Sequence, residues 1–222
     1  MHAKTTTSAR PNPLLKASTL PFHAPPFDKI KTGDYKPAIE AGMKQQLAEI
    51  KVIADQKAAP TFANTIEAME KSGALLTRAS KIFFALTGSN TNDTFQKIEA
   101  EESPKLAAHN DAIFMNPKLY ARVKTLYDKR ASSGLDAESQ YLIERYYKFF
   151  VRAGAQLNDA DQKTLRALNQ EESSLTTKFR EHVLADTAAA AIVVDTKEEL
   201  AGLPDSDIAA AADAAKGKKL TG

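Results

Sequence analysis

Histidine side chains are the groups in this sequence whose type could bind a catalytic metal ion. The chain has no cysteine and four histidines, which are His2, His23, His109 and His182. None of them stands in the His-Glu-x-x-His spacing that places two zinc ligands and a general base on one helical face. In Glu181-His182 the order is reversed, so a packing role for His182 is favoured. The sequence therefore predicts no catalytic residue and no metal ligand in this chain.

Carboxylates form two further clusters. Glu99, Glu101 and Glu102 stand close together, and Glu171 is followed by Glu172. Paired acids can perform general acid–base catalysis. In polar helical segments such as these they more often form a solvated face, which is the interpretation we favour. Neither a Gly-x-Ser-x-Gly elbow nor a phosphate-binding glycine loop occurs, so nucleophilic and nucleotide chemistry also lack a signature.

The segment Arg145–Arg152 alternates basic and aromatic residues, a pattern that can stack on a ligand. At helical spacing, however, Tyr146 and Phe150 share one face with the other apolar residues of the segment. A core with a solvated rim is therefore the favoured interpretation. The alternative is that Tyr147 or Arg152 faces a binding groove.

Composition limits the classes of function. The chain has 222 residues, 43% of them hydrophobic and 26% charged, and its formal net charge is +2. These values are typical of a soluble globular protein with one large or two modest domains. A nearly neutral chain lacks the excess of basic residues that is typical of proteins with a nucleic-acid partner. Its longest apolar run, residues 188–194, is too short to cross a membrane. We expect a soluble monomer, with the cytoplasm and the periplasm both open as its compartment.

The remaining segments must position these side chains. Five prolines fall within residues 1–33 and predict an irregular arm. Helices are then predicted to begin near residues 34, 61, 74, 92, 116, 136 and 158, and Pro104 is expected to kink or divide the fourth of them. Short helices follow the run Ile192–Val194, which is the one predicted strand and has no evident partner.

The predicted fold is mainly α. It consists of the Pro-rich arm, a multi-helix antiparallel bundle and the single short β-strand near the C-terminus. The predicted divisions are an arm at 1–33, a helical domain at 34–187, and a region at 188–222 that combines the strand with short helices. No internal repeat of fixed period is found, which counts against a helical solenoid.

Several short segments, in order, carry a specific resemblance. They are Asn12–Leu15, Leu20–Phe22, Phe27–Ile30, Tyr35–Met43, Pro60–Ile66, Ser72–Arg78, Leu106–His109, Arg145–Tyr147 and Phe150–Ala155. Together they resemble the opening part of the bacterial dipeptidyl carboxypeptidases. These are zinc metallopeptidases of the thimet oligopeptidase and oligopeptidase A family. The resemblance covers nearly the whole chain after residue 11.

The resemblance implies a part of a larger enzyme. Family members are much longer, and their zinc-binding motif lies in a later, C-terminal catalytic domain. This chain would be the N-terminal helical wall of a channel that admits short peptides, and the predicted strand would pair with one just beyond Gly222. Zinc is implied for the full-length enzyme and no cofactor for this chain. Arg78, Tyr147 and Arg152 are the candidate residues of the channel wall.

Two alternatives remain beside a peptidase portion that is inactive on its own. A free-standing helical protein could bind peptides without catalysis, or the chain could be a purely structural helical domain. The first alternative predicts peptide binding by the isolated chain, and the second predicts none.

Overall fold

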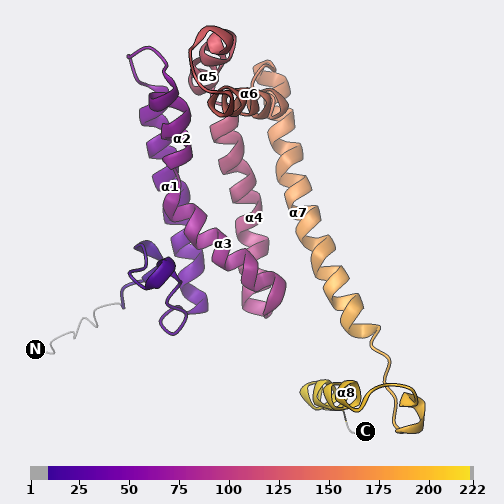
Figure 1. Ribbon diagram of the computed structural model, residues 1–222. Helices are drawn as coiled ribbons and strands as arrows, with labels where there is room; N and C mark the ends of the chain where they lie inside the picture. The colour runs from indigo at the N-terminus through magenta and orange to yellow at the C-terminus, as the bar shows by residue number, and fades with distance from the viewer. Residues whose placement is uncertain (1–9, 221–222) are drawn as a thin grey trace, which may run out of the picture. The chain divides into compact units, whose positions relative to one another are not determined.

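A computed structural model describes residues 10–220. The chain forms two compact units, which divide between Phe179 and Arg180. In the described residues all regular secondary structure is helical (Figure 1). The predicted mainly α fold is confirmed. The predicted boundaries after residues 33 and 187 stay predictions, and the first nine residues of the predicted arm lie outside the described part.

The helices follow one another with short connections. The α-helices are α1 (Tyr35–Ala54), α2 (Ala68–Lys71), α3 (Ala74–Ser89), α4 (Asp93–Phe114), α5 (Pro117–Lys129), α6 (Ala137–Arg152), α7 (Asp159–Ala189) and α8 (Asp205–Gly217). Shorter turns are η1 (Pro13–Leu15), η2 (Pro21–His23), η3 (Thr32–Asp34), η4 (Phe62–Glu67), η5 (Arg130–Ser132) and η6 (Glu198–Leu200). The element η4 is a π-helical turn, and the other turns are 3₁₀.

Polar side chains set several helix starts. Asn92 accepts hydrogen bonds from two backbone N–H groups at the start of α4, Asn116 does the same for α5, and Asp136 accepts one for α6. Such caps satisfy donors that have no partner inside the helix. Helix α4 continues through Pro104, so this proline does not divide it. Proline removes only one backbone hydrogen bond, and the rest of the helix remains bonded.

Helix α1 is the centre of the first unit. Figure 1 shows α1 and α4 running in one direction with α3 returning between them, while α5 and α6 lie across one end. This arrangement is an antiparallel bundle, as predicted. A side chain at Gly42 of α1 would have its Cβ 2.6 Å from Leu76 Cα of α3. The two helices therefore pack against each other with their backbones in close approach.

Two hydrophobic clusters fill the bundle. One joins the arm, α1, α3 and α4 around Tyr35, Phe83 and Phe95, whose ring centroids lie 5.4–5.6 Å apart. The other joins the opposite end of α1 to α5 and α6 and includes the fully buried Phe150. Because α1 contributes to both clusters, it orders the bundle from end to end.

The arm is fastened to the bundle by hydrogen bonds. Arg78 of α3 donates from Nε and Nη2 to the Leu14 carbonyl oxygen, at 3.2 and 3.1 Å. Arg10 Nη2 contacts both carboxylate oxygens of Asp34, at 2.8 and 2.5 Å. Asn12 Nδ2 donates to the Asp34 carbonyl at 2.7 Å. The arm is irregular, as its prolines predict, and its described part is held in place by these contacts.

The second unit corrects the predicted strand. Residues 191–195 have no regular secondary structure and belong to no sheet in the described part of the chain. Ile192 is 92% exposed, so its side chain lies outside any core. A β-branched run favours extended backbone, but a strand also needs a neighbour that supplies hydrogen bonds. The second unit otherwise consists of the end of α7, η6 and α8.

The contact at Gly42 gives the first prediction. Gly42→Ala should destabilise the chain by about 1–3 kcal/mol, because the new methyl group would force α1 and α3 apart. Gly88→Ala in α3 is the matched control, since nothing lies within 4 Å of the added Cβ. Urea denaturation of both variants would measure the effect, and an unchanged midpoint for Gly42→Ala would contradict the close packing.

Candidate functional site

A cavity of about 260 Å³ lies between α1, α2, α4 and α6 in the first unit. Its walls are mostly aliphatic and aromatic, and polar side chains gather on them. The polar lining residues are Gln46, Ser72, His109, Asn110 and Tyr146. A largely apolar cavity with a few polar groups is the usual form of a binding site.

A chain of hydrogen bonds fixes the histidine in this cavity. Ser72 Oγ donates a hydrogen bond to the Met69 carbonyl at 2.7 Å and accepts one from Gln46 Nε2 at 3.4 Å. Gln46 Oε1 therefore faces His109 Nε2, 2.8 Å away. Because an amide oxygen only accepts, Nε2 carries the proton. The other ring nitrogen, Nδ1, is the acceptor, and it is buried without a partner in the described structure.

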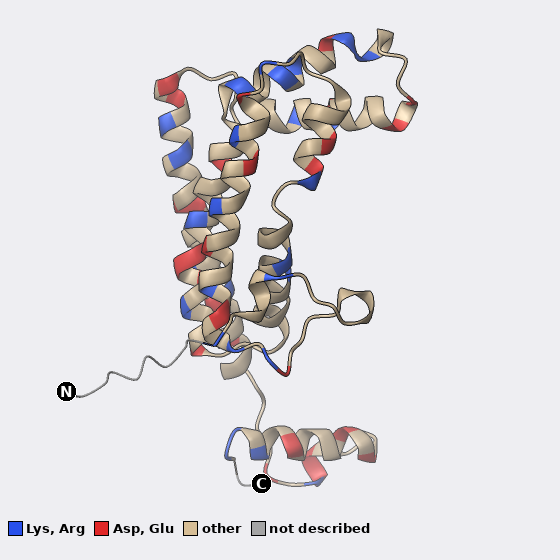
Figure 2. Cartoon of the chain, turned by 90° about the vertical axis from the view of Figure 1, so that its left-hand side faces the viewer, with Lys and Arg blue, Asp and Glu red and all other residues tan. Residues whose placement is uncertain are grey.

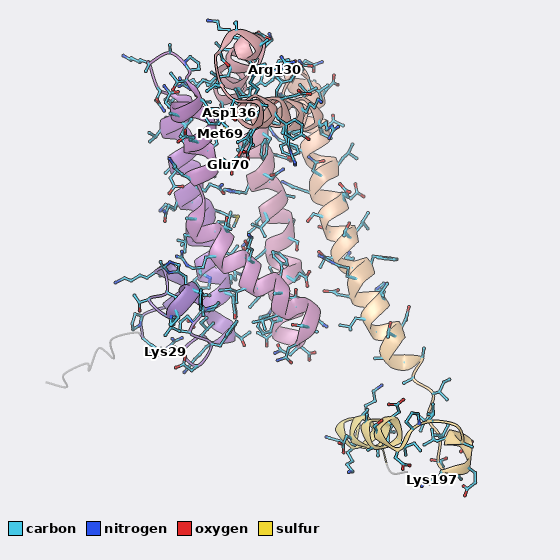
Figure 3. The ribbon with its side chains drawn as sticks, viewed as in Figure 1. Lys29, Met69, Glu70, Arg130, Asp136 and Lys197 are labelled. Atoms are coloured by element: carbon cyan, nitrogen blue, oxygen red, sulfur yellow. The ribbon has the colours of Figure 1, made fainter. Side chains whose placement is uncertain are left out.

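Burial determines the ionisation of the two titratable groups in the wall. His109 is buried, and this burial lowers the pKa of its imidazole, which favours the neutral ring. Burial raises the pKa of the Tyr146 hydroxyl, and the hydrogen bond to Glu70 Oε1, 2.6 Å long, raises it further. Figure 3 shows Glu70 and Met69 on the side of α2 that faces α4 and α6. The neutral imidazole and phenol groups can each donate and accept hydrogen bonds.

Helix α4 also carries buried acids, which corrects one interpretation of the sequence. Glu99 and Glu102 are buried, and Glu102 accepts a 2.8 Å hydrogen bond from Lys105, so the expected solvated face is wrong for these two residues. Asp111 is buried too, and its Oδ1 accepts a 2.8 Å hydrogen bond from Asn169 Nδ2 of α7. Burial raises the pKa of Asp111. The paired acids Glu171 and Glu172 are exposed, as expected.

The three candidate wall residues lie in different settings. Arg78 is engaged with the arm through Leu14. Tyr147 is half-buried and stacks on Tyr127, with ring centroids 3.9 Å apart and an interplanar angle of 8°. Arg152 is exposed at the end of α6 and makes no hydrogen bond or ion pair in the described residues. No contact brings the three together.

Tyr147 belongs to a column of rings. The Arg130 guanidinium lies 3.9 Å from the Tyr127 ring centre, and Tyr120 lies on the other side, 6.1 Å from Tyr147. Gln156 Nε2 donates to the hydroxyls of Tyr120 and Tyr147, at 2.7 and 3.4 Å. Stacked rings with oriented hydroxyls can hold a ligand or simply stiffen α5 against α6.

Sequence reasoning missed the cavity around His109. Gln46 and His109 lie 63 positions apart in the sequence, and no spacing rule links them. In the described residues no group of three or more His, Asp or Glu side chains is placed to hold a metal ion. The residues present therefore do not fit a zinc centre. Figure 2 shows basic and acidic residues interspersed along the helices.

The chain resembles known peptidases over most of its length. It is 43% identical over 209 residues to the dipeptidyl carboxypeptidase of Salmonella typhimurium, which covers 94% of this chain. It is 44% identical over 209 residues to the dipeptidyl carboxypeptidase of Escherichia coli, with the same coverage. Oligopeptidase A of Escherichia coli is 24% identical over 211 residues, 95% of this chain. No family model matches the chain.

The resemblance to the dipeptidyl carboxypeptidases is confirmed. The chain spans 31% of the length of these two relatives and 30% of the oligopeptidase A. It therefore matches about a third of the length of these dipeptidyl carboxypeptidases. Within the described residues, no helix is long and apolar enough to cross a membrane.

The burial of His109 predicts a pH dependence of stability. The folded chain keeps the ring neutral, whereas the unfolded chain binds a proton near the ordinary pKa of 6.5. Stability should therefore fall as the pH drops from 7 to 5. His109→Gln should reduce this slope, and His182→Gln on the exposed part of α7 should leave it unchanged. Equal slopes in all three proteins, measured by urea denaturation, would contradict a neutral buried His109.

Proposed function

We propose that this chain is the N-terminal helical portion of a zinc-dependent peptidyl-dipeptidase that releases dipeptides from the C-termini of short peptides. These residues form a wall of the peptide channel, and the catalytic centre lies outside them. The observation that carries the proposal is the 44% identity to a dipeptidyl carboxypeptidase across 94% of the chain.

The side chains themselves support a binding role. The described residues lack a metal-ligand cluster, whereas exposed and half-buried aromatic and basic groups are present at the end of α6. An unpaired guanidinium such as that of Arg152 suits the carboxylate or carbonyl oxygens of a peptide. The Tyr147 hydroxyl accepts a hydrogen bond from Gln156, and its own O–H group suits a peptide carbonyl oxygen. These two residues are the preferred wall contacts, and Arg78 is a secondary one.

A row of exposed apolar side chains on α7 supports the proposal that this chain packs against a further domain. Leu168, Leu175 and Phe179 are 55%, 57% and 69% exposed. Large apolar side chains exposed along one helix indicate a surface that packs against further polypeptide. The proposed catalytic domain would supply this polypeptide. The same exposed row is a reason to prefer this proposal over a free-standing peptide-binding protein.

A chimera tests the proposed function. The matched segment of the Escherichia coli dipeptidyl carboxypeptidase would be replaced by this chain, and dipeptide release from short peptides would be measured. We expect kcat/KM within about tenfold of the parent, equivalent to about 1.4 kcal/mol. The parent lacking the segment is the negative control. A folded chimera that releases no dipeptides would contradict the proposal.

The role of Arg152 is tested in the same chimera. Arg152→Ala should raise KM by about tenfold through the loss of a charged hydrogen bond, while stability changes by less than about 0.5 kcal/mol because the residue is exposed. Arg145→Ala is the matched control, since this arginine lies on the same helix over the Phe149 ring. An unchanged KM together with a lowered melting temperature would assign Arg152 a structural role instead.

A further inference from the structure

A second hollow of the first unit is a groove in the N-terminal arm, which the proposed function does not use. Its volume is about 680 Å³, and it is lined by residues 10–13, 15, 16, 28, 29 and 31. Pro11, Pro13 and Leu15 provide its apolar surface. Leu14 is buried in the bundle, whereas the neighbouring Leu15 is 44% exposed. Figure 3 labels Lys29 on this arm.

Hydrogen bonds join the two sides of the groove. Arg10 Nη1 donates to the Lys29 carbonyl at 2.8 Å, and Arg10 Nη2 binds the Asp34 carboxylate. Asn12 Nδ2 reaches the Asp34 carbonyl from the same side. The two lining segments are thus fixed to each other, and a ligand would meet a preformed surface.

The groove carries an excess of positive charge. Its lining includes four cationic side chains and only one carboxylate, that of Asp28. Arg10 is paired with Asp34. Burial raises the pKa of the Asp34 carboxyl group, but the hydrogen bond from Arg10 and the nearby charge of Lys31 lower it, and the net shift is downward. Lys16 and Lys29 are exposed and form no ion pair within the part of the chain that the structure describes. These two ammonium groups are therefore available to a ligand.

We infer that this groove docks an extended peptide segment in which carboxylates alternate with apolar side chains. The carboxylates would pair with Lys16 and Lys29, and the apolar side chains would cover Leu15 and the two prolines. Alternation suits an extended chain, because successive side chains point to opposite sides. Residues 1–9 include Lys4 and no acid, so the chain's own start does not supply this charge. The inference does not rest on the proposed peptidase function.

Other anionic partners fit the groove less well. A nucleic acid requires a broad basic face, whereas the whole chain has a net charge of only +2. The apolar side chains of Pro11, Pro13 and Leu15 in the groove also offer no favourable contact to phosphate groups. A peptide supplies both the charge and the apolar contact that the groove presents.

The test uses the full chain and a fluorescent ten-residue peptide of alternating Glu and Leu. The control peptide replaces every Glu with Gln. At low salt the affinity for the acidic peptide should be at least about three times the affinity for the control peptide, as expected for exposed ion pairs. This preference should shrink as the ionic strength rises. Equal affinity for the two peptides, or no binding of either, would overturn the inference.

Matched variants locate the binding. Lys16→Gln combined with Lys29→Gln should remove the preference for the acidic peptide. Lys44→Gln combined with Lys57→Gln changes the net charge equally at exposed positions elsewhere and should retain it. An equal loss in both double variants would show nonspecific attraction and overturn the inference. Tighter binding of phosphatidylserine vesicles or single-stranded DNA than of the acidic peptide would overturn it as well.

Discussion

The close contact between α1 and α3 at Gly42 is the constraint on which the first unit depends. Because Gly42 has no Cβ, the two helices lie so close that any larger residue at this position would clash with the backbone of Leu76. This approach places α1 between both hydrophobic clusters. It also brings the start of α3 beside the middle of α1, where Gln46 meets Ser72 and His109. The cavity around His109 is therefore a consequence of how closely these helices pack.

Polar groups of α4 are buried in the bundle and limit how the neighbouring helices can pack against it. His109, Glu102 and Asp111 all lie on α4 and are buried, and burial of polar groups costs stability unless each is hydrogen-bonded. Each of the three has one partner and one buried atom without a partner in the described structure. Such groups specify how neighbouring helices meet α4 and leave hydrogen-bonding capacity for a ligand or for water.

The sequence predicted most of the helices, because apolar spacing and capping residues such as Asn92, Asn116 and Asp136 are local signals. Short segments along the chain were also enough to show the resemblance to the dipeptidyl carboxypeptidases. It did not predict the cavity at His109, which depends on a contact with Gln46, 63 positions away. It also did not predict the burial of Glu102, since burial depends on how the helices pack against one another. The strand at Ile192–Val194 was wrong because local β-propensity says nothing about a hydrogen-bonding neighbour. Tyr147 was named only as a candidate wall residue, and its stacking on Tyr127 could not be predicted because it depends on how α5 meets α6.

The proposed division, with a peptide-binding wall in these residues and a catalytic centre outside them, is tested most directly by the coding DNA. The reading frame would be sequenced beyond the codon for Gly222. We expect an in-frame continuation that encodes a His-Glu-x-x-His motif, because the relatives are about three times as long as this chain, which covers 31% of them. A stop codon directly after Gly222 would contradict the account. The cell would then make this helical chain alone, and a binding protein without catalysis would be the better description.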